Sequence, residues 1–230
     1  MTKISIIIPV LNEENYIGVL LKHLETNSSP KNISDIIVVD GGSSDGTKAI
    51  IKSFENITLI SSDKGRAKQM NLGAKTSKGG VLYFLHADAF PPKDFDHLIL
   101  KELSKGNEAG CFRMQFDSKH WWLRLASWFT QFNIRPCRGG DQSQFITREL
   151  FTDIGGYDED YVIYEDNILI NELYARKQFV VINSKIRTSA RQYKKVGVWK
   201  LQYHFWSIYV KRWFGASADD IYTYYKKHIR

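Results

Sequence analysis

The segment Ile4-Ser-Ile-Ile-Ile-Pro-Val10 indicates the class of fold, together with the polar residues Asn12, Glu13 and Glu14 that follow it. A short, almost wholly apolar run is typical of a strand that is buried on both faces. We expect Asn12 to cap the next helix. The apolar residues that share one face of that helix are Ile17, Leu20, Leu21 and Leu24. The chain therefore opens as strand, polar loop and helix.

The same alternation continues through the first half of the chain. We predict strands at Ile36–Val39, Ile57–Ile60 and Val81–Leu85, and helices at Thr47–Phe54 and Arg66–Thr76. Strands that alternate with helices form βαβ units and a mainly parallel sheet. Ligands of such open sheets bind outside the carboxyl ends of the strands. The polar residues after the predicted strands are therefore the first candidates for a site.

The second half of the chain is less regular. It predicts strands at Ala109–Phe116 and Gln144–Thr147, a turn of helix to Ile154, and helices at Trp121–Thr130 and from Tyr164 through Arg176. We find no internal repeat and no low-complexity linker, and the character of the sequence changes near residue 108.

Composition excludes several classes of protein. The chain has 230 residues, of which 43% are hydrophobic and 25% charged, as in globular proteins. Cys111 and Cys137 are the only cysteines, so neither a disulfide framework nor a four-cysteine zinc site can form, and we expect packing roles in a reducing compartment. The first apolar run is too short for a signal peptide, and no run of about 18 apolar residues is present. We therefore expect a cytoplasmic protein.

Positive charge is concentrated at the carboxyl end of the chain. Residues 187–230 contain ten basic and two acidic residues, whereas the remainder carries a net charge of −1. Aromatic residues alternate with these cations. This pattern indicates phosphates or an anionic membrane surface as partners rather than nucleic acid, and the protein would then be peripheral on the cytoplasmic membrane face. An ordinary helix with a solvated basic face is the alternative.

The first polar cluster is Asp40-Gly-Gly-Ser-Ser-Asp-Gly46. Asp40 ends a strand, and the glycines after it permit close approach of a ligand. The Asp40 carboxylate could accept a hydrogen bond from a ribose or from the N–H group of a base. Ser44 or Asp45 can alternatively cap the helix from Thr47. Two other nucleotide or phosphate sites fail on spacing: the dinucleotide G-x-G-x-x-G is absent, and the second aspartate of a dehalogenase-type phosphotransferase would fall on Gly42.

Two further clusters carry carboxylates. His86-Ala-Asp88 follows a strand, and an imidazole with a carboxylate on alternate residues can hold Mg²⁺ or Mn²⁺ that also bridges to substrate phosphates. Glu165-Asp166 opens a helix, where acidic residues also suit the helix dipole. Because neighbours on a helix point about 100° apart, we expect at most one of the pair to face the cleft, where it could act as a general base.

Together these elements resemble glycosyltransferase family 2, the GT-A-fold enzymes that transfer a sugar from a nucleotide donor with inversion. Order and spacing agree over residues 3 to about 191, in particular with a small soluble branch that carries His-Ala-Asp and a later Ser-Ala-Arg. The matching segments are 5–14, 37–47, 65–74, 82–89, 139–142, 155–159, Glu165-Asp166 and Ser189-Ala-Arg191.

The resemblance implies a role for each matching residue. Pro9, Leu11, Glu13 and Asp40 would line the nucleoside pocket, and Arg66 would reach the nucleoside or its phosphates. Asp88 would hold either a divalent cation, Mn²⁺ or Mg²⁺, or the ribose-phosphate region of the donor, with His86 at the position where the family usually has an acidic residue. Asp166 would be the general base. The acceptor or phosphate side would include Asp141, Gln142, Glu165 and Arg191.

The expected architecture follows from the same resemblance. We expect an α/β fold of the GT-A type, a three-layer sandwich with a mainly parallel central sheet. Residues 1–190 would form the glycosyltransferase domain, with a nucleotide-binding half at 1–108 and an acceptor half at 109–190. Residues 191–230 would form a helical, aromatic and basic extension. The expected reaction moves a sugar from a nucleotide-diphosphate donor, a UDP-sugar in the commonest case, to an acceptor hydroxyl, with a lipid-linked acceptor as one candidate.

Two other functions fit parts of the sequence. A nucleotidyltransferase can use the same layered fold, although the chain lacks a glycine-rich loop with a lysine near the first strand. A non-catalytic module that binds a membrane surface or RNA would use the basic aromatic tail.

Overall fold

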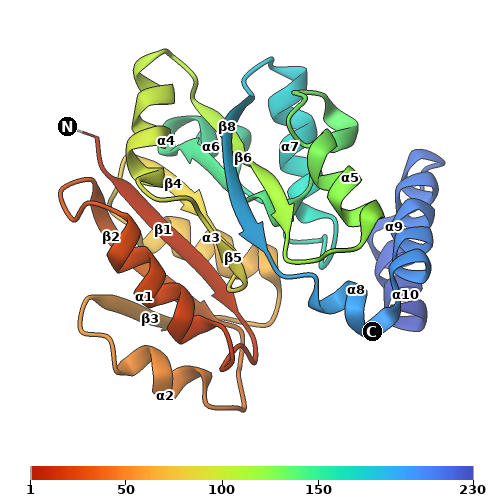
Figure 1. The fold of residues 1–230 in the computed structure, drawn as a ribbon, viewed down its shortest axis with the longest axis horizontal. Helices are drawn as coiled ribbons and strands as arrows, with labels where there is room; N and C mark the ends of the chain where they lie inside the picture. The colour runs from red at the N-terminus through yellow and green to blue at the C-terminus, as the bar shows by residue number, and fades with distance from the viewer. Residues whose placement is uncertain (1, 230) are drawn as a thin grey trace.

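The computed structural model describes residues 2–229 and contains one mixed sheet with helices on both faces (Figure 1). The strands are β1 (Ile4–Val10), β2 (Ile33–Asp40), β3 (Ile57–Ser61), β4 (Val81–Phe84), β5 (Ala89–Phe90), β6 (Ala109–Phe116), β7 (Gln144–Thr147) and β8 (Val180–Thr188). The α-helices are α1 (Ile17–Asn27), α2 (Thr47–Lys52), α3 (Arg66–Thr76), α4 (Phe95–Ser104), α5 (Trp121–Phe129), α6 (Arg148–Ile154), α7 (Glu165–Ala175), α8 (Arg191–Val196), α9 (Val198–Trp213) and α10 (Ala218–His228). Short 3-10 turns cover Arg135–Cys137 and Gly140–Gln142.

The strand order is β3-β2-β1-β4-β7-β6-β8-β5. The pairs β3–β2, β2–β1, β1–β4 and β6–β8 are parallel, whereas β7 runs antiparallel to β4 and β6, and β5 to β8. In the parallel register, Val10 lies beside Asp40. The carboxyl ends of β2, β1 and β4 therefore lie at one edge of the sheet, as the sequence predicts.

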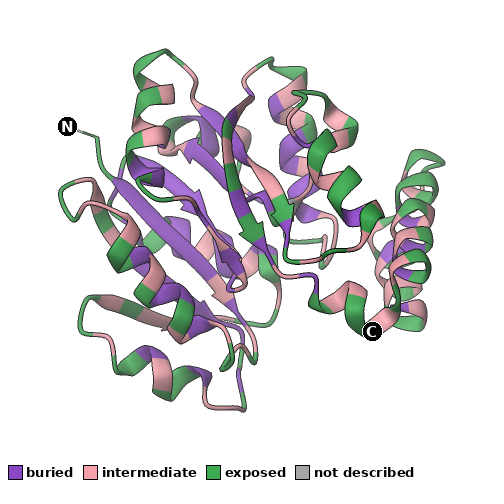
Figure 2. Cartoon of the chain, viewed as in Figure 1, coloured by how far each residue is buried: buried purple, intermediate pink, exposed green. Residues whose placement is uncertain are grey.

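Each face of the sheet has its own apolar layer, and this produces three layers. Ile4, Ile6 and Ile8 of β1 belong to one buried cluster, which also contains the apolar residues of α1 and α4. Ile7 belongs to the opposite cluster, with residues from α3, α6 and α7. Because successive side chains of a strand alternate between faces, a strand covered on both sides must be apolar throughout. Figure 2 shows β1 buried along almost all of its length.

The carboxyl-terminal helices pack beside the sheet rather than on it. Figure 1 shows α8, α9 and α10 at one end of the molecule, next to α5. Their own cluster of buried residues is small, and Tyr161, Ile163 and Tyr164 from the segment before α7 pack against it. Ser217 and Asp220 form a reciprocal capping box at the start of α10. The predicted helical extension is thus present, and its last residue, Arg230, lies outside the described residues.

The structure corrects three expectations about local elements. Asn12 does not cap α1: the helix begins at Ile17, and Asn12 has a left-handed backbone conformation with φ 57°. Its side chain instead accepts a hydrogen bond from Ser44 N at 2.9 Å. Helix α4 and strand β8 were not predicted, and β2 begins at Ile33, three residues before the predicted start at Ile36.

The close approach of α3 to β1 depends on Gly73. A Cβ atom at this position would lie 2.4 Å from Ile7 Cγ2. We predict that Gly73→Ala destabilises the protein by about 2 kcal/mol, because overpacking a dense core forces neighbouring atoms apart. Gly139→Ala is the matched control, since a Cβ atom there meets nothing within 4 Å. Chemical denaturation of both variants tests this, and equal stability of the two would contradict it.

Candidate active site

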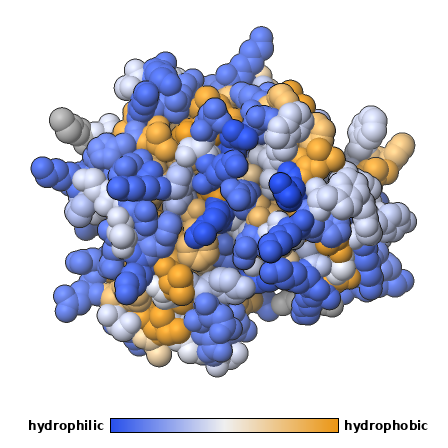
Figure 3. Space-filling model, viewed as in Figure 1, coloured by the Kyte–Doolittle hydropathy of each residue, from blue (hydrophilic) through white to orange (hydrophobic). Residues whose placement is uncertain are grey.

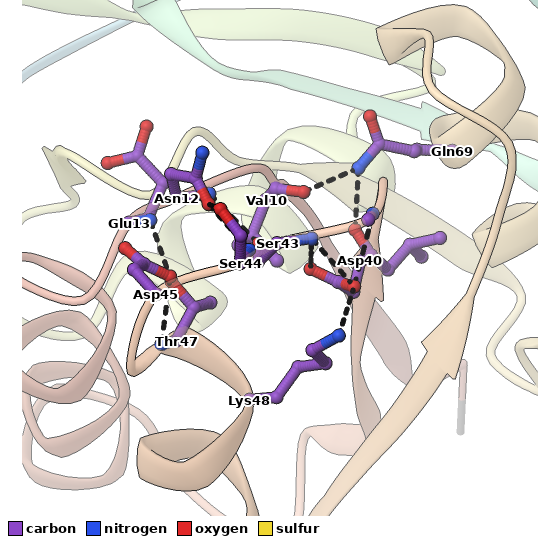
Figure 4. A network of polar contacts seen from close by, with 12 residues as sticks. Val10, Asn12, Glu13, Asp40, Ser43, Ser44, Asp45, Thr47, Lys48 and Gln69 are labelled. Atoms are coloured by element: carbon purple, nitrogen blue, oxygen red, sulfur yellow. Dashed lines mark hydrogen bonds and ion pairs between the residues drawn. The ribbon is translucent and has the colours of Figure 1, made fainter.

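The first part of the site is the carboxylate of Asp40 at the end of β2. Asp40 is 1% exposed, and its oxygens accept hydrogen bonds from the backbone N–H groups of Gly42 at 3.1 Å and Ser43 at 3.0 Å. Lys48 Nζ lies 3.9 Å away. Gly42 has φ 95°, a conformation that favours glycine, and it permits this tight turn. Figure 4 shows Asp40 between Ser43 and Lys48.

The loop after β1 is bonded to the loop after β2. Asn12 N donates to Ser43 Oγ at 2.9 Å, and Glu13 N donates to Thr47 Oγ1 at 2.8 Å. Asp45 Oδ1 accepts from Thr47 N at 3.0 Å, but the N-cap residue of α2 is Gly46, so the prediction that Ser44 or Asp45 caps this helix is wrong. These bonds, drawn in Figure 4, hold the two strand-end loops in one arrangement.

Gln69 of α3 is a site residue that the analysis of the sequence missed. It is 5% exposed, and its Nε2 donates to Val10 O at 2.9 Å and to Val39 O at 2.7 Å (Figure 4). One amide therefore bridges the ends of β1 and β2. The signal in the sequence was a polar residue among the buried positions Ala67, Met70 and Ala74 of the same helix.

Arg191 joins two of the predicted carboxylates. Its guanidinium donates to both oxygens of Glu13, at 2.6 and 2.7 Å, and its Nε lies 3.0 Å from Asp88 Oδ2. The same group lies 4.7 Å above the ring centroid of Tyr16. Burial raises the pKa of Asp88, and Arg191 opposes that rise. The start of α8 thus reaches the ends of β1 and β4.

Arg66 contacts both members of the acidic pair at the start of α7. Arg66 NH1 lies 3.1 Å from Glu165 Oε1 and 3.6 Å from Asp166 Oδ2. The Glu165 side chain is 1% exposed and that of Asp166 is 12% exposed, so both are largely buried beside this guanidinium. Tyr164 has a left-handed conformation with φ 75°, and the helix begins at Glu165, so both side chains lie in its first turn. That at most one of the pair faces the cleft stays a prediction.

Glu165 has an unusual environment for a carboxylate. It is 1% exposed, and its Oε1 has no hydrogen bond of good geometry among residues 2–229, although it contacts Arg66. Burial raises the pKa of Glu165 to about 7, against the opposing effect of Arg66 and with a further rise from Asp166. Glu165 in turn raises the pKa of Arg66, so the guanidinium remains charged.

His86 and Asp141 face each other across the site. His86 Nδ1 lies 3.7 Å from Asp141 Oδ1. Burial and Arg66 lower the pKa of His86, but Asp141 and Asp166 more than offset them, so the net shift is upward. Burial raises the pKa of Asp141, whereas His86 and two arginines lower it to a net value below the usual one.

Among residues 2–229, no three His, Cys, Asp or Glu side chains are grouped so that they could hold a metal ion by themselves. Mg²⁺ and Mn²⁺ do not need such a cage, since they keep several waters and bind through one or two carboxylates plus substrate phosphates. The partly accessible Asp88 carboxylate fits this second mode.

Gln142 does not join the group. It is 3% exposed, and its amide hydrogen-bonds to Arg138, to the thiol of Cys111 and to the carbonyl of Cys137. These contacts hold the 137–142 loop. Burial raises the pKa of the Cys111 thiol to about 11, as fits a packing role.

Pro9 and Leu11, which flank the end of β1, are half-buried beside the Asp40 loop.

Fold and site define a class: an α/β protein whose parallel strands present carboxylates and arginines at one edge of the sheet. The family model for glycosyl transferase family 2 matches residues 5–169. Because this match spans more than half of the chain, the protein belongs to that family, as the motifs predict.

Known proteins agree with this assignment. The curated glycosyltransferase AglE of Haloferax volcanii is 36% identical over 94 residues, which cover 38% of this chain and 31% of AglE. The structure of S. aureus TarS in complex with UDP-GlcNAc superposes with a TM-score of 0.68 at 21% identity, over 81% of this chain and 58% of that one. The mannosyltransferase PcManGT of Pyrobaculum calidifontis, in complex with GDP-Man and Mn²⁺, has a TM-score of 0.66 at 18% identity, over 90% and 60% of the two chains. These structures confirm the GT-A fold.

The chain spans less than half of the length of the first curated relatives that it matches. Within residues 2–229, no helix has the length and apolar character needed to cross a membrane.

The raised pKa of Glu165 predicts a pH-dependent stability. Between the ordinary value of 4.5 and about 7, the folded protein binds more protons than the unfolded chain, so this contribution to stability decreases as pH rises. Glu165→Gln lacks this contribution. Relative to that of the wild type, the free energy of unfolding of the variant should rise by on the order of 2 kcal/mol between about pH 4 and pH 8.

Denaturant titrations at several pH values test this prediction, with Glu149→Gln at an exposed position as the control. A stability difference between Glu165→Gln and wild type that does not change with pH would contradict it.

Proposed function

We propose that this protein is an inverting glycosyltransferase that moves a sugar from a nucleotide-diphosphate donor, a UDP-sugar, to an acceptor hydroxyl. The observation that carries the proposal is the set of charges at one edge of the sheet. Asp40, Glu13 and Asp88 follow β2, β1 and β4, and the Arg66 pair with Glu165 and Asp166 lies across from them. Family membership supports the proposal and argues against the nucleotidyltransferase alternative.

The donor side is the strand-end loops. Asp40 and the residues around Pro9, Leu11 and Glu13 are proposed to receive the nucleoside, since they surround the interlocked loops after β1 and β2. The proposal divides the domain 1–190 into a nucleotide-binding half at 1–108 and an acceptor half at 109–190. Asp141, Glu165 and Arg191 are proposed to lie on the acceptor or phosphate side. Gln142 is proposed to support the 137–142 loop on that side.

The reaction is a single displacement. The acceptor oxygen bonds to the anomeric carbon as the bond from that carbon to the diphosphate oxygen breaks, and the acceptor proton passes to Asp166. No group on the protein becomes covalently attached to the sugar, so the configuration inverts, unlike in a covalent glycosyl-enzyme route. Arg66 holds the Asp166 carboxylate in place and stabilises the charge that develops on the leaving diphosphate.

A divalent cation, Mn²⁺ or Mg²⁺, is proposed to bind between Asp88 and the donor diphosphate. It would supply electrostatic stabilisation of the leaving group. The 3.0 Å contact with Arg191 uses Asp88 Oδ2, and the cation would compete with that guanidinium for the carboxylate. His86 is the second proposed ligand of this cation, and its Nδ1 lies 3.7 Å from Asp141 Oδ1.

Donor class is tested by calorimetry with UDP, GDP, TDP and CDP, each with and without Mn²⁺. We expect UDP to bind most tightly and Mn²⁺ to strengthen its binding. Asp88→Ala should abolish the metal effect while leaving weaker, metal-independent binding through the Asp40 loop. The absence of binding to all four diphosphates by the folded protein would contradict the proposal.

The general base is tested by Asp166→Asn. We expect the release of UDP from UDP-sugars to fall by at least about 10²-fold, because the acceptor proton has no carboxylate to receive it, while UDP affinity is retained. Asp153→Asn, which alters an exposed carboxylate paired with Arg176, is the matched control and should keep full activity. Full turnover by Asp166→Asn would remove this residue from the mechanism.

A further inference from the structure

Helix α9 is apolar on two opposite faces. Leu201, His204 and Ile208 are buried against the small cluster formed with α10. The opposite face carries five exposed residues at alternating spacings of four and three, which places them on one side of the helix. They are Trp199, Tyr203, Trp206, Val210 and Trp213, with exposed fractions from 48% to 86%. A surface helix normally has polar residues on such a face.

Helix α5 presents a second exposed apolar row. Trp121, Leu125, Trp128 and Phe129 are each at least 36% exposed, and Leu123 is the buried residue of this helix. Phe132 extends the row beyond the helix, with its ring 5.1 Å from that of Trp128.

The two rows meet to form one surface, which we call the α5–α9 face. The ring of Trp199 lies 5.7 Å from that of Trp121 and 5.5 Å from that of Trp122, and Trp122 lies 5.8 Å from Trp206. Trp122 Nε1 also donates to Gln202 Oε1 at 3.1 Å. A contiguous exposed apolar patch that extends over two helices marks an interaction site. Figure 3 shows pale and orange side chains at the end of the molecule that α9 and α10 form, where blue polar side chains border them.

The charge beside this face has one sign. Neither α5 nor α9 contains an Asp or Glu residue, whereas Arg124 of α5 and Lys200 and Lys211 of α9 are exposed, with Lys211 Nζ 5.1 Å from the ring centroid of Tyr224 of α10. Residues 187–230 carry a net charge of +8. A surface that combines exposed Trp and Tyr rings with cations matches the interface of a bilayer that contains anionic lipids, where aromatic rings lie at the level of the headgroups.

A second copy of the chain fits this face less well. A two-fold contact would bring the same cationic residues of both copies together. An anionic bilayer instead complements them, and each lysine or arginine near such a surface strengthens binding.

We propose that the α5–α9 face is a docking surface for an anionic lipid bilayer and that the protein binds there without spanning it. The face is joined to the site, because the Tyr209 ring of α9 lies 5.3 Å from that of Tyr164 and its hydroxyl hydrogen-bonds to Asn167 Oδ1 at 3.3 Å. Asn167 is the neighbour of the proposed base. This consequence rests on the proposed function: docking would bring the acceptor side of the site to the membrane, where the site could receive a hydroxyl of a lipid-anchored acceptor.

The test is flotation with phosphatidylcholine vesicles, with and without phosphatidylglycerol. We expect binding that requires phosphatidylglycerol and weakens as salt is added. Lys200→Glu with Lys211→Glu should lower vesicle affinity at least about tenfold. Val210→Ser should lower it severalfold, whereas the matched Val19→Ser, at an exposed position on α1, should not. Brominated lipids should quench tryptophan fluorescence in the wild type and less in Trp213→Ala.

Asp166→Asn separates docking from catalysis, because it should bind vesicles as well as the wild type does. Several outcomes would overturn the docking proposal. One is vesicle binding that is absent or unchanged by the Lys and Val210 variants. A second is a concentration-dependent dimer in ultracentrifugation that Val210→Ser disrupts, which would assign the face to another copy. A third is tight binding of an RNA oligonucleotide without binding to vesicles.

Discussion

The site depends on how the ends of β1 and β2 are held together. Gln69 donates to the carbonyl of Val10, the last residue of β1, and to that of Val39, the residue before the end of β2, and Asp40 accepts two backbone N–H groups of the loop that follows. These polar groups are buried, and a buried donor or acceptor without a partner costs about 1–3 kcal/mol. Each bond therefore restricts the loops to the arrangement that satisfies all of them. Glu13 is positioned by the same constraint, because its backbone N–H donates to Thr47 Oγ1, whereas the carboxylate of Asp88 contacts Arg191.

Charge balance at the site explains why arginines lie between its carboxylates. Glu13 and Asp88 share Arg191, and Glu165 and Asp166 share Arg66. Without these guanidiniums, like charges would lie close together in a partly buried region, which is costly. A diphosphate and a divalent cation bring charges of both signs. Under the proposed function, such a ligand would replace these pairs, and Arg66 and Arg191 would then pair with the diphosphate.

Much of the fold could be predicted because its signals are local. The apolar run of β1 and the polar residues after β1, β2 and β4 identify a sheet edge with a site, and the register confirms their proximity. Strand β8 was missed because its buried and exposed residues alternate only in part along Val180–Thr188. The double contact of Arg66 and the pairing of Arg191 with Glu13 could not be predicted, since they join residues far apart in sequence through backbone geometry, as at Tyr164.

The carboxyl-terminal helices combine a structural and a surface role, and the order of their residues explains how. The buried side of α9 packs with α10 and with Tyr161, Ile163 and Tyr164, directly before the acidic pair of α7. Arg191, at the start of α8, reaches the opposite side of the site. The extension therefore contacts the site from both directions through side chains that face inward. On its outward face, Trp199 and Trp206 bury part of their rings against α5, but Trp213 is 86% exposed, and the proposed docking explains why so much aromatic surface is left open there.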